Sequence, residues 1–178
     1  MEVAFYIAGI VAVIATFMAI TRRNPVHALL YLVVSLLAVA LVFYVIGAPF
    51  IAALEVIIYA GAIIVLFLFV VMILGNVVVR PAELDRHLQR PLTYVGPAAL
   101  GLVLLGEFIY ILVRGAPGQT GPVAISPQEL GEALFGPYLV GVELAALLLL
   151  AGLVGAYYLG RPKQPGEPEG ETDGDRSA

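Results

Sequence analysis

The chain has 178 residues, of which 61% are hydrophobic and only 12% charged, and its mean hydropathy is +1.01. A soluble domain usually carries about 25% charged residues. This composition therefore excludes a soluble domain and predicts helices that span a bilayer. The chain has no cysteine and two histidines, which excludes disulfides and thiolate metal sites and argues against a haem or metal site built on paired histidines. Its net charge of −4 arises mainly from acids near the C-terminus, and we expect no nucleic-acid partner.

Charges and turn-forming residues divide the first half of the chain into three predicted membrane helices. The first helix ends at Arg22-Arg23, and because no basic residue precedes it, we expect a retained helix rather than a signal peptide. Asn24-Pro25 is typical of a helix start, and Gly47-Ala48-Pro49 is typical of a tight turn. The three helices are therefore expected over Val3–Thr21, Val26–Ile46 and Phe50–Leu74.

The second half of the chain predicts two more membrane helices. A charged loop between Gly75 and Arg90 precedes a helix expected over Pro91–Val113. Ser126-Pro127-Gln128-Glu129 is typical of the capped start of a short surface helix, and the fifth span is expected over Tyr138–Leu159. The fold class is therefore an all-α integral membrane protein, with a five-helix transmembrane domain over residues 1–160 and a disordered cytoplasmic tail over 161–178.

The basic residues near the helix ends predict the orientation of the chain. With five spans, the loops after the first and third helices and the C-terminal tail share one side of the membrane. That side holds eight of the nine basic residues, and the other side holds Arg114 alone. Because basic loops remain in the cytoplasm, we expect a periplasmic N-terminus and a cytoplasmic C-terminus.

Three carboxylates lie inside the predicted helices: Glu55, Glu107 and Glu143. Each costs about 2.5–3.5 kcal/mol at the centre of a membrane helix unless it finds a partner, water or a proton. In the expected orientation all three lie roughly 7–9 Å below the outer boundary, at about 1.5 Å per residue. They could share a water-filled pocket, in which burial favours the neutral, protonated carboxyl group. Alternatively, each reaches headgroup water, and for Glu107 and Glu143 both interpretations stay open.

Glu55 has further polar and small residues beside it in the third helix. Tyr59 follows at i+4, on the same helix face, and its hydroxyl can both donate and accept a hydrogen bond. The next residues are Ala60-Gly61-Ala62. Small residues allow close packing of membrane helices, but they also give the backbone freedom that a π-bulge needs, and such bulges often occur at functional sites. Composition alone favours packing.

Three runs of the sequence resemble one known family. The run from Asn24 to Tyr31 is similar to the start of the second helix in subunit J of the proton-pumping NADH:quinone oxidoreductase, respiratory complex I. The run from Glu55 to Met72 resembles the third-helix signature of that family, whose mitochondrial counterpart is chain six. The run from Phe135 to Leu144 resembles its last helix. The likeness extends from Met1 to about Arg161.

This resemblance implies a subunit of a hetero-oligomer in a bacterial inner (plasma) membrane, in contact with lipid and with subunits similar to A, H, K and N. It implies no redox or catalytic centre in this chain, while FMN, iron–sulfur clusters and quinone belong to the whole complex. It also implies a π-bulge at Tyr59 and Gly61. Its conversion to regular α-helix would rotate later side chains by about 100° and make or break a water chain. A glutamate at the position of Glu55 is usual in the family, whereas the resemblance implies no role for Glu107.

We therefore expect a non-catalytic subunit that couples quinone reduction to proton translocation. The alternatives are a stand-alone transporter that uses Glu55, Glu107 and Glu143, a structural membrane scaffold, and a subunit of a related membrane-bound hydrogenase or antiporter complex. Few polar residues lie within the spans, and no internal repeat of the transporter kind is present, which disfavours the stand-alone transporter.

Overall fold

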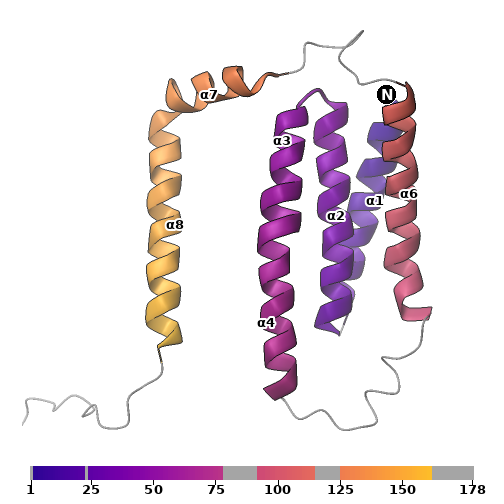
Figure 1. Cartoon of the computed structure of the whole chain (residues 1–178), viewed down its shortest axis with the longest axis horizontal. Helices are drawn as coiled ribbons and strands as arrows, with labels where there is room; N and C mark the ends of the chain where they lie inside the picture. The colour runs from indigo at the N-terminus through magenta and orange to yellow at the C-terminus, as the bar shows by residue number, and fades with distance from the viewer. Residues whose placement is uncertain (1, 23, 78–91, 115–124, 162–178) are drawn as a thin grey trace, which may run out of the picture. The chain divides into compact units, whose positions relative to one another are not determined.

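Helices form every regular element in the part of the chain that the structure describes. The computed structural model describes residues 2–22, 24–77, 92–114 and 125–161, so most of the predicted charged loop and nearly all of the predicted tail lie outside the described residues. The elements are α1 (Glu2–Thr21), α2 (Pro25–Val45), α3 (Pro49–Leu54), the π-helix η1 (Glu55–Ile63), α4 (Ile64–Val77), α6 (Leu92–Arg114), α7 (Pro127–Phe135) and α8 (Leu139–Gly160) (Figure 1).

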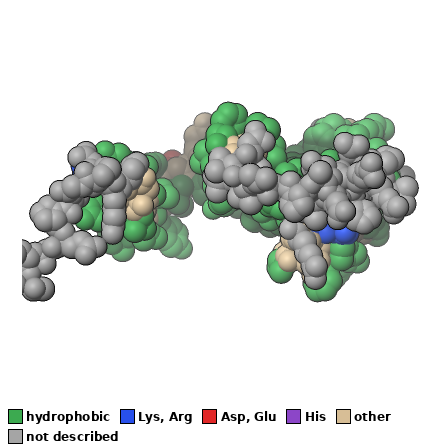
Figure 2. Space-filling view, turned by 90° about the horizontal axis from the view of Figure 1, so that it is seen from below, with side chains coloured by type: hydrophobic (Ala, Val, Ile, Leu, Met, Phe, Trp, Pro, Cys, Tyr) green, Lys and Arg blue, Asp and Glu red, His purple; other side chains and the backbone are tan. Residues whose placement is uncertain are grey.

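Five helical stretches among these residues are long and apolar enough to cross a membrane, which confirms the predicted all-α fold. The third of them is a continuous rod made of α3, η1 and α4 (Figure 1). Helix ends differ from the expected positions by at most one residue, except that α4 continues past Leu74 to Val77. Hydrophobic side chains cover most of the described surface in Figure 2, as contact with lipid requires.

Two compact units divide the chain, Met1–Glu129 and Leu130–Ala178. In the first unit α2 is central, since it contacts α1, α3, η1, α4 and α6. One face of α1 carries small residues at helical spacing, and their burial brings α1 close to α2, as is usual where membrane helices associate. These residues are Ala4, Ala8, Val11 and Ala15, and they share a core with Val34, Ala38 and Leu41 of α2 and Leu104 and Ile111 of α6.

Two hydroxyl groups join α1 to α2 inside this packed interface. The Oγ1 of Thr16 lies 2.7 Å from the Oγ of Ser35. Ser35 also donates to the carbonyl oxygen of Ala12 at 3.2 Å, so the hydroxyl of Thr16 is the donor to Ser35. Interhelical hydrogen bonds in membranes contribute only about 0.6 kcal/mol on average. Their main effect here is to fix the register of α1 against α2.

Local sequence signals set both ends of α2. The Oδ1 of Asn24 accepts a hydrogen bond from the amide of Val26 at 2.9 Å, and Pro25 takes the first helical position. At the other end Gly47 has a φ of 93°, the left-handed conformation that glycine adopts at low cost. Its amide bonds to the carbonyl of Tyr44, and the amide of Ala48 bonds to Phe43. This pair of bonds closes the helix in a Schellman motif, and α3 begins directly after it.

Aromatic and polar side chains pack together where α1 ends and α2 and α6 begin. Arg22 donates to the hydroxyl of Tyr31 at 3.3 Å and lies 5.2 Å from the centre of its ring. The ring of buried His27 lies 4.9 Å from that of Tyr94. Gly96 faces the hydroxyl of Tyr31 so closely that a Cβ atom there would collide with it. This cluster therefore ties the three helices together at one end.

The second unit contains the end of α7 and all of α8. The cap of α7 is reciprocal, as the sequence predicts: the amide of Ser126 donates to Glu129 at 3.0 Å, and the amide of Glu129 donates to the Oγ of Ser126 at 3.2 Å. Between the helices, a Cβ atom on Gly136 would lie 2.7 Å from the carbonyl oxygen of Glu132. Only glycine fits this turn without a shift of the backbone.

We predict that Gly96→Ala destabilises the protein by about 1–3 kcal/mol, the usual cost of inserting a methyl group into a packed site. The added methyl group must displace the Tyr31 hydroxyl and with it the contact to Arg22. The measurement is thermal unfolding of the detergent-solubilised protein. Gly101→Ala in the same helix is the matched control, because a Cβ atom there meets nothing within 4 Å. Equal unfolding temperatures for the two variants would contradict the prediction.

Candidate functional site

A nine-residue π-helix interrupts the third membrane span from Glu55 to Ile63. Before it, the amide of Glu55 bonds to the carbonyl of Ile51, four residues earlier, as in an α-helix. After it, the amide of Ile64 bonds to the carbonyl of Tyr59, five residues earlier. The span thus changes hydrogen-bond register within this segment. Because π-turns are rare and occur frequently at functional sites, η1 is the candidate functional element.

Gly61 suits this change of register. A Cβ atom on it would lie 3.1 Å from the carbonyl oxygen of Val56, five residues earlier. That contact is tighter than an ordinary van der Waals contact, so any larger residue would push the Val56 carbonyl away. The absence of a side chain at Gly61 therefore eases the π register, in addition to any packing role.

The π-helix η1 contacts α2, but its own residues stay largely exposed in the described part of the chain. None of its residues is buried. A cavity of about 710 Å³ borders η1. Val56 and Ile57 of η1 line this cavity, together with apolar residues of α2, α3 and α6, including Ala40, Leu104 and Phe108. A segment without buried residues can change its backbone register at a lower cost than a tightly packed one.

Glu55 and Tyr59, the two predicted polar residues of this span, both lie in η1. Glu55 is half-buried, and the side chain of Tyr59 is 51% exposed. Among the described residues no hydrogen bond or ion pair is formed by either side chain, and neither lines the large cavity. Both groups are therefore available to water or to side chains other than the described ones.

Glu107 lies in a different environment. It is only 9% exposed, on the face of α6 that carries Leu104 and Ile111 into the core shared with α1 and α2. Both of its carboxyl oxygens are buried and lack a hydrogen-bond partner. The cavity between α6 and η1 is not lined by Glu107 or by Glu55. A buried, unpaired carboxylate is unfavourable, so this group needs a proton or a partner.

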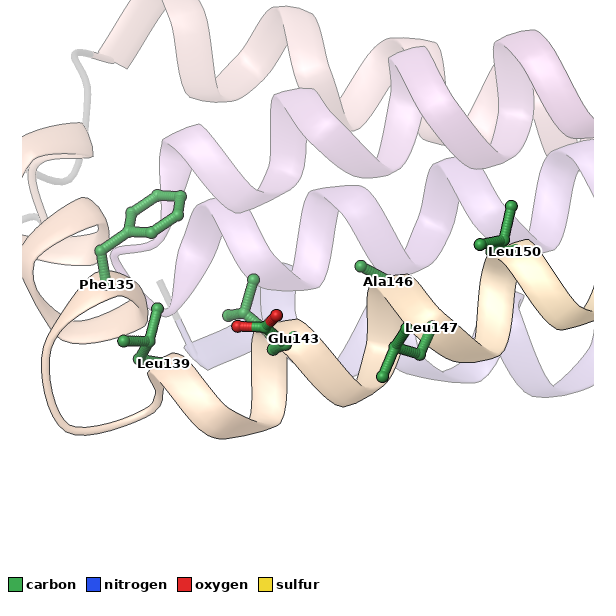
Figure 3. Close-up of a pocket in the computed structure, with 7 residues that line it drawn as sticks. Phe135, Leu139, Glu143, Ala146, Leu147 and Leu150 are labelled. Carbon is green, nitrogen blue, oxygen red and sulfur yellow. The ribbon is translucent and has the colours of Figure 1, made fainter.

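Glu143 is exposed on α8. It lines a hollow of about 360 Å³ with residues that are otherwise apolar, among them Phe135, Leu139 and Leu147 (Figure 3). No described residue pairs with its carboxylate. Each within its own unit, the three carboxylates thus differ in burial, although the sequence predicts a similar depth for all of them.

The structure also brings forward a residue that the sequence analysis did not select. His27 is 4% exposed, and its Nδ1 atom is buried without a hydrogen-bond partner. His27, Tyr31 and Ser35 are all buried and follow one another at i, i+4 and i+8 on one face of α2. That spacing is visible in the sequence and could have predicted that the three side chains share one helix face. Among the described residues, no group of three side chains could hold a metal ion.

Comparison with known proteins gives consistent matches over most of the chain. A model of the family described as NADH-ubiquinone/plastoquinone oxidoreductase chain 6 matches residues 15–159. The chain is 54% identical over 162 residues to NADH-quinone oxidoreductase subunit J of Pseudomonas aeruginosa, which covers 90% of this chain and 97% of that protein. It is 48% identical over 167 residues to the subunit J of Escherichia coli K12, covering 94% and 90%. A subunit J from Rhodobacter capsulatus is 36% identical over 167 residues, covering 88% and 79%.

We predict that Glu107→Met raises the free energy of unfolding by about 1–3 kcal/mol, because a methionine of similar size removes the buried, unpaired oxygens. Glu107→Gln is the matched control, since its amide is equally unpaired and gains nothing. Chemical unfolding of the detergent-solubilised chain measures both. A loss of stability in the methionine variant would mean that the carboxyl group has a partner, against the prediction.

Proposed function

Since this chain belongs to the family of NADH-ubiquinone/plastoquinone oxidoreductase chain 6, we propose that it couples quinone reduction to proton translocation through a register change in η1. The chain is a membrane subunit of an NADH-quinone oxidoreductase, an enzyme complex of several subunits. In this proposal FMN, iron–sulfur clusters and quinone are held by other subunits. This chain contributes no redox group and works in a bacterial inner membrane beside subunits of the A, H, K and N types.

The observation that supports this proposal is the change from i−4 to i−5 hydrogen bonding between Glu55 and Ile64. If η1 became α-helical, α4 would rotate by about 100° and shift by about 1.5 Å relative to α3. The two registers are alternative, fully bonded states of one segment, and coupling of distant sites needs a discrete two-state element of this kind. The absence of buried residues in η1 supports a low cost for the exchange.

Glu55 and Tyr59 have different parts in this mechanism. Glu55 begins the π segment next to α3 and keeps its position, whereas Tyr59 lies within the segment and moves when the register changes. Since both side chains lack partners among the described residues, water can join them in one register and not in the other. The switch would thereby connect or interrupt a path for protons, with Gly61 as the residue that lowers the cost of the π register.

Glu107 and Glu143 are proposed as further sites of proton transfer, outside η1. Neither belongs to the segment that changes register, so each would hold or pass a proton independently of the switch. Glu107 is the more suited to hold one, because its burial without partners makes the charged form unfavourable.

The proposed orientation has the N-terminus in the periplasm and the C-terminus in the cytoplasm, because eight of nine basic residues then lie on the cytoplasmic side. In that orientation Glu55, at the start of η1, lies nearer the periplasmic surface, and Tyr59 carries the path deeper into the membrane.

We predict that Tyr59→Phe and Gly61→Val leave an assembled complex that still reduces quinone but pumps fewer than half as many protons per electron. The first change removes the hydroxyl from the water path, and the second strains the π register against the Val56 carbonyl. The measurement is NADH-driven acidification in liposomes that contain the purified complex. Tyr6→Phe and Gly9→Val are matched controls in α1, where Tyr6 is exposed and a Cβ on Gly9 meets nothing within 4 Å. Normal pumping by both η1 variants would contradict the proposal.

We also predict the orientation of the spans. Alkaline phosphatase, which is active only in the periplasm, should be inactive when fused after Arg161 and active when fused after Arg114. Enzyme activity in intact cells measures both fusions, with fusion abundance as the control. The reverse pattern would refute a cytoplasmic C-terminus.

A further inference from the structure

The buried polar residues of the described chain gather in one place, the interface of α1, α2 and α6. They are His27, Ser35 and Glu107, and all three belong to the first unit. The ring of His27 lies against Tyr94 of α6, and the hydroxyl of Ser35 bonds to Thr16 of α1. One hydroxyl pair is enough to fix the register of two helices. It does not explain why the Nδ1 atom of His27 and both oxygens of Glu107 are also buried here without a described partner.

Polar side chains form a continuous face along the first half of α2. His27, Tyr31 and Ser35 follow one another at i, i+4 and i+8, with about 6 Å along the axis between successive residues. The face begins beside the exposed Arg22, which donates to the hydroxyl of Tyr31. It ends at Ser35, whose hydroxyl lies 2.7 Å from that of Thr16. Buried groups that donate and accept hydrogen bonds therefore lead from the start of α2 into the membrane.

Glu107 lies a short distance beyond the end of this face. The contact of His27 with Tyr94 places positions 27 and 94 at one level. From there Ser35 lies about 12 Å along α2 and Glu107 about 20 Å along α6. Because side chains in a helix point back toward its N-terminus, the carboxyl group of Glu107 lies closer to the level of Ser35 than its own Cα does. A bridging water molecule can span the remaining distance.

No buried polar residue among those described continues from Glu107 toward the opposite end of the bundle. The buried residues there are Ala4 and Ala8 of α1, Leu41 of α2 and Ile111 of α6. The cavity beside η1 is lined mainly by apolar side chains and does not include Glu107. Buried polar groups thus lead away from Glu107 in one direction, toward the start of α2.

We propose that Glu107 exchanges its proton through the polar face of α2, by way of Ser35 and Thr16, with water at the start of that helix. This end is cytoplasmic in the proposed orientation. The inference rests on the proposed role of Glu107 as a site of proton transfer. It does not require a register change in η1.

The transfer conserves one proton on each hydroxyl group. When Glu107 is charged, the Ser35 hydroxyl turns from the Ala12 carbonyl and gives its proton, directly or through a water molecule, to a carboxylate oxygen. The Thr16 hydroxyl then gives its proton to Ser35 across their 2.7 Å contact. Thr16 regains a proton from the side of Tyr31 and His27, where an imidazole can take up a proton on one nitrogen and release one from the other. The net result is a neutral Glu107 and one proton fewer in the water at the start of α2.

The test follows the proton of Glu107 by infrared spectroscopy of the intact complex. The carbonyl stretch of a protonated carboxyl group that disappears in Glu107→Gln belongs to Glu107, and its shift after transfer to D₂O gives the exchange rate. We expect Ser35→Ala and Thr16→Val to exchange several-fold more slowly than the unchanged chain. Thr16→Val keeps the shape of the side chain, and Thr16→Ser, which keeps the hydroxyl, should restore the rate. An unchanged rate in Ser35→Ala or in Thr16→Val would overturn the proposed route.

Tyr44→Phe is the matched control, because Tyr44 packs against the same core near the opposite end of α2. Its exchange rate should equal that of the unchanged chain, and slower exchange would mean that the proton comes from that end, against the proposal. The absence of any carboxyl band assignable to Glu107 would refute its role as a proton site as well as the route. A band with an exchange rate insensitive to Ser35 and Thr16 would refute the route alone. The pumping of the Tyr59 and Gly61 variants tests the switch in η1 separately.

Discussion

A backbone amide that loses its partner inside a bilayer finds no water to replace it, and this constraint governs what each span can do. Every interruption of a membrane helix must keep its peptide groups bonded or enclose them in protein. The π-helix from Glu55 to Ile63 meets the requirement, because the amide of Ile64 still has a carbonyl partner at Tyr59. A change to α-helix would exchange one set of bonds for another. The third span can therefore depart from a regular α-helix without leaving backbone amide or carbonyl groups permanently unpaired.

The first unit contains a part with a buried core and a part without buried residues. Small residues on α1, the hydroxyl pair of Thr16 and Ser35, and the contact of Gly96 with Tyr31 hold α1, α2 and α6 against one another. On another side of α2, η1 borders a cavity and buries none of its residues. A register change needs both parts, since the moving segment must be free while the helix beside it stays fixed.

Much of this fold could be predicted from the sequence, because the determining signals are local. Charged stretches end the spans, Asn24-Pro25 and Ser126 through Glu129 cap helices, and the left-handed Gly47 closes α2. The length of the π-helix could not be predicted from residue types, since small residues at positions 60–62 serve packing equally well. The resemblance to a known family indicated a bulge near Tyr59 and Gly61. The backbone bonds give its extent, from Glu55 to Ile63.

The three membrane carboxylates show why site prediction from sequence stops at residue type and depth. Residue spacing gives Glu55, Glu107 and Glu143 similar positions along their helices, but burial depends on which face meets which neighbour. Glu107 faces the core shared with α1 and α2, Glu55 begins a segment with no buried residue, and Glu143 lies exposed in a hollow of α8. A carboxyl group enclosed by apolar side chains favours its neutral form, whereas an accessible one can pair with a donor or exchange a proton. Three carboxylates at a similar predicted depth thus have different surroundings, which depend on tertiary contacts rather than on residue spacing.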